Sequence, residues 1–133
     1  DIEYFKEYND HFGHVQGDCA LKKIGQCMNE CFNRPEDMVC RLGGEEFLIC
    51  FSCADKKTIV ENGKRLYDGV KGMGIKSCSG GNLTVSIGGM GIVPAKGDKE
   101  PDLLCLVDRC DKLLYQAKRE GKDQIVYDQA VTA

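Results

Sequence analysis

Asp1 and Glu45 are acidic residues that lie far apart in the sequence and have the side-chain chemistry of a magnesium site. Asp1 opens an apparent passage from a strand into a helix, and Glu45 lies at the expected tip of a hairpin. If these elements are neighbours, both carboxylates meet at one sheet edge, where oxygen ligands hold Mg²⁺ together with phosphates and water. On spacing alone, solvated surface acids are the simpler explanation.

The same hairpin contains two consecutive glycines, Gly43 and Gly44, directly before Glu45. A glycine in a turn often serves a positive φ, and it also lets a backbone approach a ligand closely. Either explanation fits these two glycines taken alone.

The spacing of apolar residues predicts the elements that must position these side chains. Helices are expected over residues 10–31, with possible breaks near Gly13 and Gly17, over 55–70, and over 101–119, where Gly121 ends the last one. Strands are expected over residues 38–42, 47–51, 83–87 and 124–127. Helices that alternate with a hairpin and single strands predict a sheet with helices packed on it.

The composition sets further limits on the class of protein. The 133 residues fit one domain with a core of its own. A net charge of −3 argues against a nucleic-acid polymer as partner, and it leaves a nucleotide substrate open. No apolar run approaches the roughly 20 residues of a membrane helix. Nine cysteines without a signal peptide favour reduced thiols in the cytoplasm, and a zinc or redox protein has little support because Cys50-x-x-Cys53 lacks a matching second pair.

Four ordered blocks of sequence resemble one family. Residues 41–47 read RLGGEEF and are similar to the signature hairpin of the GGDEF family in its GGEEF form. The blocks that start at Asp1 (DIEYFKEYND), Thr84 (TVSIG) and Leu114 (LYQAK) resemble three further family segments. On these blocks, residues 1–133 are identified as a member of the GGDEF family, the catalytic domains of diguanylate cyclases. The resemblance implies an α+β fold, a ferredoxin-like antiparallel sheet flanked by helices, of the nucleotidyl cyclase and polymerase palm type.

The resemblance also implies the reaction and its residues. Two GTP molecules would be condensed into the second messenger cyclic di-GMP, with release of pyrophosphate, between two domains of a homodimer. Asp1, Glu45 and the Ile2 carbonyl would hold Mg²⁺ or Mn²⁺. Glu45 and Lys6 would be the catalytic residues, with Glu45 helping to deprotonate the attacking 3′-hydroxyl. The implied substrate-binding residues are Tyr4, Phe5, Asn9, Asp18, Gly43, Gly44, Lys118 and Lys122.

Asn9 and Asp18 would recognise guanine, because a carboxylate can accept from both N1–H and N2–H₂, an edge that adenine lacks. Without the resemblance, Asn9 is explained as a helix cap and Asp18 as a surface acid. Lys118 and Lys122 would bind phosphates. They share one face if the helix continues through Gly121; otherwise helical geometry places only Lys118, and a solvated cationic helix end is the alternative.

Arg34 and Asp37 form an R-x-x-D turn that is separated from Gly43 by five residues. This spacing resembles the family's inhibitory product site, in which Arg and Asp bind the guanines of cyclic di-GMP. Arg65, on the following helix, would be a further contact. Taken alone, an R-x-x-D turn is an exposed ion pair of little energy.

Three features depart from the family pattern. Glu3 stands where the family usually has Asp, and Lys122 stands where it often has Arg, whose bidentate phosphate geometry a lysine lacks. The family's domain normally begins earlier, so we expect its N-terminal helix and first strand to be missing from residues 1–133. The main alternative function is a catalytically silent GGDEF module that senses GTP or binds cyclic di-GMP; intact Glu45, Lys6 and Asn9 argue against it. A cytoplasmic protein, or the cytoplasmic part of a larger signalling protein, is expected.

Overall fold

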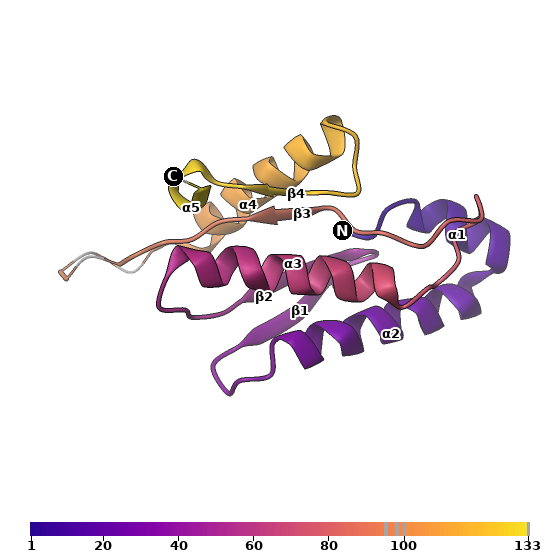
Figure 1. Ribbon diagram of the computed structural model, residues 1–133, viewed down its shortest axis with the longest axis horizontal. Helices are drawn as coiled ribbons and strands as arrows, with labels where there is room; N and C mark the ends of the chain where they lie inside the picture. Colours follow the sequence, from indigo (N-terminus) through magenta and orange to yellow (C-terminus); the bar gives the residue numbers. More distant parts are fainter. Residues whose placement is uncertain (95, 98, 100, 133) are drawn as a thin grey trace.

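The computed structural model describes residues 1–94, 96–97, 99 and 101–132. Helices and short strands alternate along the chain, which confirms the α+β class (Figure 1). The elements are α1 (Phe5–Phe12), α2 (His14–Cys31), β1 (Met38–Gly43), β2 (Glu46–Cys50), α3 (Lys56–Gly72), β3 (Ile87–Gly89), α4 (Leu103–Arg119), β4 (Ile125–Tyr127) and α5 (Gln129–Thr132).

The helix expected over residues 10–31 is two helices, α1 and α2, separated at Gly13. The expected break at Gly13 is confirmed, whereas Gly17 lies inside α2. The first helix also begins earlier than expected, at Phe5, because Phe5 and Tyr8 bury their rings one turn apart. This bend folds α1 back against α2, which brings the first residues of the chain near residues of α2.

The strands form two pairs. β1 and β2 make the expected antiparallel hairpin, with Met38 opposite Cys50 and Gly43 opposite Glu46. β3 and β4 pair in parallel, with Ile87 opposite Ile125, beside the antiparallel hairpin. The reason for the parallel pairing is α4, which crosses over between them and returns the chain in its original direction.

Asp1 to Glu3 connect the two pairs of strands. The Ile2 amide donates to the Glu45 carbonyl at 3.2 Å, and the Glu3 amide donates to the Thr84 carbonyl at 2.9 Å. Ile2 also forms an isolated antiparallel bridge with Val85, where the expected strand 83–87 is present only as this bridge and the start of β3. The start of the chain therefore lies between the tip of the hairpin and the segment that leads into β3 (Figure 1).

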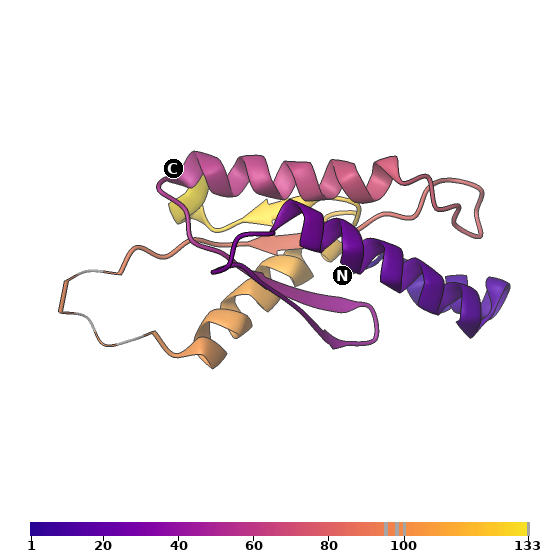
Figure 2. The same cartoon turned by 90° about the horizontal axis from the view of Figure 1, so that it is seen from below.

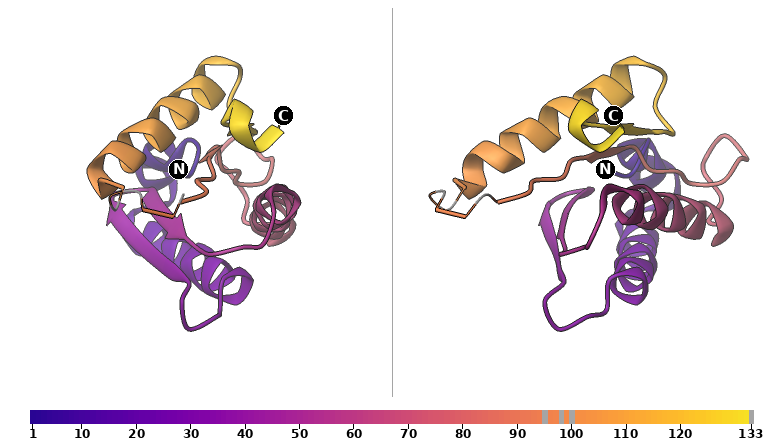
Figure 3. Two further views of the ribbon diagram at one scale, coloured as in Figure 1. Left: turned by 90° about the vertical axis from the view of Figure 1, so that its left-hand side faces the viewer. Right: turned by 60° about the vertical axis from the view of Figure 1, so that its left-hand side comes forward.

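The core lies beneath this connection, between α2 and α3. Its fully buried side chains include Ile2, Ile24, Val70 and Leu83, each at most 2% exposed. Helices α3 and α4 cover opposite faces of β3 and β4 (Figure 3). The core thereby fixes the backbone of Ile2, and with it the position of Asp1 at the end of the hairpin.

An apolar groove of about 470 Å³ separates the hairpin from β3 and α4. Phe47 and Ile49 line it from β2, Ile87 lines it from β3, and Val107 and Leu114 line it from α4. Among the described residues, β2 and β3 are not paired with each other, and the hairpin stands apart from the β3–β4 pair (Figure 2). In the part of the chain that the structure describes, no helix combines the length and the apolar character needed to cross a bilayer.

Candidate active site

The hairpin turn presents Glu45 beside the start of the chain. Gly44 and Glu45 form the two-residue loop between β1 and β2, and Gly44 adopts a φ of 53°, which glycine accepts without a steric penalty. A Cβ atom added at Gly43 or Gly44 would meet no atom within 4 Å, so the space beside the turn is open. The Ile2–Glu45 backbone hydrogen bond joins this turn to the segment that carries Asp1. The structure therefore brings the two predicted carboxylates to one edge of the sheet.

A polar cavity of about 220 Å³ lies at this edge. It collects residues from three separate parts of the chain: the first seven residues, the hairpin turn and the end of α4. Phe5 borders the cavity, although its side chain is 5% exposed and belongs to the core. The lining residues are Asp1, Ile2, Glu3, Tyr4, Phe5, Lys6, Glu7, Glu45, Lys118 and Lys122.

Acidic and basic side chains are paired across this cavity. Lys118 Nζ lies 2.9 Å from Asp1 Oδ1, and the Asp1 side chain is only 4% exposed. Lys122 Nζ lies 3.9 Å from Glu3 Oε2 and 4.3 Å from the centre of the Tyr4 ring. The lysines offset the repulsion between neighbouring buried carboxylates, and each is also available to an anionic ligand.

Glu3 is a site residue that the sequence did not indicate. Its side chain is 3% exposed, and Oε1 has no hydrogen-bond partner among the described residues. A buried carboxylate oxygen without a partner is costly unless a ligand or water satisfies it. The sequence signal was its position two residues after Asp1, which in an extended segment points both side chains to the same face.

The turn after α4 decides how Lys122 is placed. The Glu120 amide donates to the Gln116 carbonyl and the Lys122 amide donates to the Ala117 carbonyl, both at 2.9 Å, around Gly121 with a φ of 124°. These bonds end the helix in a Schellman-type turn, so Gly121 is confirmed as its terminator. Helical geometry therefore places Lys118 alone, and the turn brings Lys122 into the same cavity.

Asn9 lies against α2 at Gly17. Its Oδ1 is buried and has no hydrogen-bond partner among the described residues. A Cβ added at Gly17 would lie 1.7 Å from that atom, so only glycine permits this approach. Asp18, the next residue, is exposed on α2. The bend at Gly13 thus places Asn9 against Gly17, the α2 residue that precedes Asp18.

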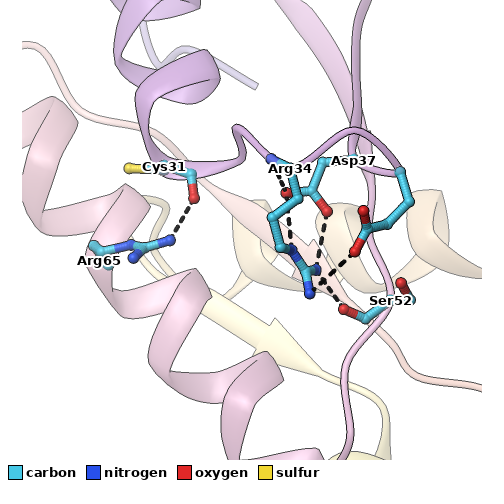
Figure 4. A network of polar contacts seen from close by, with 6 residues as sticks. Cys31, Arg34, Asp37, Ser52 and Arg65 are labelled. Carbon is cyan, nitrogen blue, oxygen red and sulfur yellow. Dashed lines mark hydrogen bonds and ion pairs between the residues drawn. The ribbon is translucent and has the colours of Figure 1, made fainter.

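Arg34 and Asp37 pair with each other in the turn between α2 and β1 (Figure 4). Arg34 Nη2 lies 2.9 Å from Asp37 Oδ1, and the Arg34 amide donates to Asp37 Oδ2 at 3.1 Å. The Arg34 guanidinium also donates to the Ser52 carbonyl beyond β2. Hydrogen bonds from Arg34 hold the pKa of Asp37 below its usual value.

Arg65 lies on α3 and donates to the Cys31 carbonyl at the end of α2 (Figure 4). It is near enough to Asp37 to lower the pKa of that carboxyl further, after the larger effect of Arg34. The structure therefore brings Arg65 into the neighbourhood of the R-x-x-D turn, with its guanidinium directed at α2.

The donors at the cavity suit a hard cation. No three His, Cys, Asp or Glu side chains among the described residues are grouped to hold a metal by themselves. Mg²⁺ usually takes one or two protein carboxylates and completes its shell with phosphate oxygens and water. Asp1 and Glu45, with the buried and unpartnered Glu3 Oε1 nearby, fit that requirement. All nine cysteines are free thiols, as the sequence predicted.

The family model described as "Diguanylate cyclase, GGDEF domain" matches residues 1–124. The chain belongs to this family. It is similar to the diguanylate cyclase DosC of Escherichia coli K12, with 32% identity over 94% of this chain and 26% of that protein. It is also similar to the diguanylate cyclase DgcP of Pseudomonas aeruginosa, with 33% identity over 94% of this chain and 18% of that protein. The chain thus spans about a quarter or less of these relatives.

Solved structures show the same fold. The GGDEF domain of DgcB from Caulobacter crescentus, in complex with c-di-GMP, aligns with a TM-score of 0.81 and 25% identity over 100% of this chain and 75% of that one. The active GGEEF domain of a Vibrio cholerae diguanylate cyclase aligns with a TM-score of 0.79 and 25% identity over 96% of this chain and 78% of that one. The fold that the resemblance implied, with α+β architecture of the palm type, is confirmed.

Proposed function

We propose that this domain condenses two molecules of GTP into cyclic di-GMP, with release of pyrophosphate. The observation that carries the proposal is the meeting of Asp1 and Glu45 with three lysines in one open polar cavity. Carboxylates that share a cavity with phosphate-binding lysines are the recurring arrangement of sites that transfer nucleotidyl groups. Membership of the family and the relatives named above support the same reaction.

Asp1, Glu45 and the Ile2 carbonyl would hold Mg²⁺ or Mn²⁺. When bound, the cation would polarise the α-phosphate and neutralise charge on the departing pyrophosphate. The phosphates are bound by Lys6, Lys118 and Lys122. When Lys118 binds a phosphate, it leaves its ion pair with Asp1. Glu45 lies at an exposed turn and accepts the proton of the attacking 3′-hydroxyl.

Asn9 and Asp18 select guanine. The carboxylate of Asp18 accepts from N1–H and N2–H₂, and the amide of Asn9 satisfies a further polar atom of the base. The buried Asn9 Oδ1, which lacks a protein partner among the described residues, supports this role. Adenine leaves these groups unpaired, so the site also disfavours cyclic dinucleotides made from ATP.

The reaction requires a homodimer. One cavity of about 220 Å³ accommodates the reacting groups of one nucleotide, and the attacking hydroxyl belongs to a second nucleotide. The hairpin turn with Gly43 and Gly44 is open on its outer side, which supports the approach of a second domain there. GTP supply and the free thiols both favour the cytoplasm as the site of action.

Product inhibition is the regulatory part of the proposal. Arg34, Asp37 and Arg65 would bind the guanines of cyclic di-GMP outside the cavity, as the resemblance implied. The Arg34 side chain is 46% exposed and can be reached by a ligand, whereas the Asp37 carboxylate is 3% exposed, so guanine binding would require the pair to open. A catalytically silent module that keeps only this site is the alternative, and turnover of GTP decides between them.

The whole of residues 1–133 forms one cyclase domain in this proposal. The groove between β2 and β3 is apolar and runs up to Asp1, which it also contacts. One further strand in that groove would join the two strand pairs into a single sheet.

Incubation of the protein with GTP and Mg²⁺ tests the function. Cyclic di-GMP and pyrophosphate are the expected products, and a matched Glu45→Gln variant is expected to make neither. Cyclic di-GMP binding without any turnover would instead support the silent module.

A further inference from the structure

Three consecutive residues after α4 have positive φ angles: 124° at Gly121, 65° at Lys122 and 47° at Asp123. Glycine adopts such angles freely, but a lysine and an aspartate in succession do so at a cost. Strained backbone of this kind persists only where neighbouring groups determine it. The contacts that hold this turn therefore indicate what the turn is for.

Helix α3 holds the turn through the side chains of Tyr67 and Lys71. The Tyr67 hydroxyl lies 2.8 Å from Asp123 Oδ1 and 3.0 Å from the Asp123 carbonyl oxygen. Lys71 Nζ donates to Asp123 Oδ2 and to the Tyr67 hydroxyl, each at 2.9 Å. The contacts to Asp123 span more than fifty residues of sequence and involve both its side chain and its backbone.

The residue next to Asp123 is Lys122, which lies at the cavity. Its ammonium group lies 4.3 Å from the centre of the Tyr4 ring and 3.9 Å from Glu3 Oε2. Since α4 ends at Arg119, the helix does not fix the direction in which Lys122 leaves the backbone. The turn fixes this direction, and Asp123 is the residue of the turn that forms hydrogen bonds with α3.

We propose that Tyr67, Lys71 and Asp123 are positioning residues that hold the left-handed turn so that Lys122 reaches the nucleotide phosphates. The inference rests on the proposed function, because it takes the phosphates as the target of Lys122. None of the three is among the residues that line the polar cavity, so they act only through Lys122.

A purely structural bond would have a different signature. The Lys71 and Asp123 side chains are about 40% exposed, so the loss of their pair costs little stability. A positioning role predicts that the loss instead appears as weaker nucleotide binding, and only in a chain that has Lys122. This coupling separates the two roles.

The test is a double-mutant cycle on the full chain. The ligand is a GTP analogue with a methylene group in place of the oxygen between the α- and β-phosphates, bound with Mg²⁺ and followed by calorimetry. Tyr67→Phe removes the hydroxyl and keeps the ring. Tyr115→Phe is the matched control, because Tyr115 is exposed on α4 and touches neither the turn nor the cavity. Lys122→Met provides the second background.

We expect Tyr67→Phe to weaken binding about threefold to tenfold, the size of one lost hydrogen bond, with Tyr115→Phe unchanged. In the Lys122→Met background the same change is expected to have no effect. Asp123→Asn, which tolerates the left-handed angle and still accepts from Tyr67, is expected to bind more tightly than Asp123→Ala.

Two outcomes overturn the inference, and they differ in what else they overturn. If Lys122→Met weakens binding but Tyr67→Phe does not, or does so equally in both backgrounds, the positioning role is wrong and the phosphate role of Lys122 stands. If Lys122→Met binds the analogue as tightly as the native chain, the phosphate role in the proposed function is wrong as well.

Discussion

Lys118 and Asp1 form an ion pair, with 2.9 Å between Nζ and Oδ1. The pair joins the first residue of the chain to the last turn of α4, and the Asp1 side chain is almost fully buried in it. Asp1 is the proposed metal ligand and Lys118 the proposed phosphate ligand. Each side chain therefore keeps the other from its proposed ligand until metal and nucleotide bind together.

Replacement of Lys118 by Met separates these two roles. We expect Mn²⁺ to bind more tightly to Lys118→Met in the absence of nucleotide, by roughly threefold to tenfold, because a positive charge beside the cation is gone. GTP with Mg²⁺ is expected to bind more weakly. Electron paramagnetic resonance of free Mn²⁺ and calorimetry with GTP measure the two effects, with Lys112→Met on the outer face of α4 as the control. Unchanged Mn²⁺ affinity would show that Asp1 is not part of the metal site.

Gly17→Ala tests the place of Asn9. The added methyl group would overlap Asn9 Oδ1 and press on the Phe5 ring, so Asn9 must move. We expect weaker GTP binding and a lower melting temperature. Gly25→Ala is the matched control in the same helix, because its Cβ meets nothing within 4 Å, and it is expected to stabilise the protein by about 0.5–1 kcal/mol. Equal effects of the two substitutions on GTP affinity would remove Asn9 from the guanine site.

Arg34→Ala tests product inhibition. The basal rate is expected to stay the same, because Arg34 lies outside the polar cavity. The concentration of cyclic di-GMP needed for half inhibition is expected to rise about tenfold or more, the value of one bidentate contact to guanine. Initial rates at increasing product concentration measure it, and Arg109→Ala, which breaks the ion pair with Asp128, is the control. An inhibition curve that coincides with that of the native chain would rule out this turn as the inhibitory site.

The Asp55 carboxylate is expected to make the stability of the protein depend on pH. The carboxylate accepts from the Thr58 amide and the Thr58 hydroxyl, each at 2.8 Å, and caps the first turn of α3. These bonds lower the pKa of Asp55, so its contribution to stability is present above the pKa of an unfolded aspartate and is lost as the pH falls through the folded pKa. Asp55→Ala is expected to lower the melting temperature at pH 7 and to narrow its difference from the native chain in acid.

Asp55→Asn serves as the matched variant, because asparagine caps a helix as well as aspartate does but does not titrate. Near pH 7 its melting temperature is expected to equal that of the native chain. In acid its melting temperature is expected to fall less than that of the native chain. Thermal melts of the three proteins at neutral and acidic pH measure this. A pH dependence of Asp55→Asn identical to that of the native chain would assign the effect to other carboxylates.

Local sequence signals predicted the elements well. The glycines at the hairpin turn, at the break between α1 and α2 and after α4 stand where only a special backbone conformation fits, so Gly44, Gly13 and Gly121 marked their turns correctly. Two short apolar runs predicted the bounds of β1 and β2 to within one residue.

Features that depend on contacts distant in sequence could not be predicted in this way. The parallel pairing of β3 with β4 follows from how α4 packs across them, and the start of α1 follows from the left-handed Tyr4, whose φ is 55°. The burial of Glu3 beside Lys122 depends on the strand pairing of Ile2. The hydrogen bond between Tyr67 and Asp123 joins residues that are 56 apart, and no local sequence pattern indicates it.

Glu45 is the residue on which the account depends most directly, because it stands at the open turn and is proposed to serve both the metal and the attacking hydroxyl. The decisive measurement is chromatography of the nucleotides after the native chain and Glu45→Gln are each incubated at high concentration with GTP and Mg²⁺. Glu61→Gln, on the exposed face of α3, is the control for the loss of one carboxylate. The account predicts cyclic di-GMP and pyrophosphate from the native chain and from Glu61→Gln, and neither from a Glu45→Gln protein with an unchanged melting temperature. Cyclic di-GMP formed by Glu45→Gln at the native rate would contradict it.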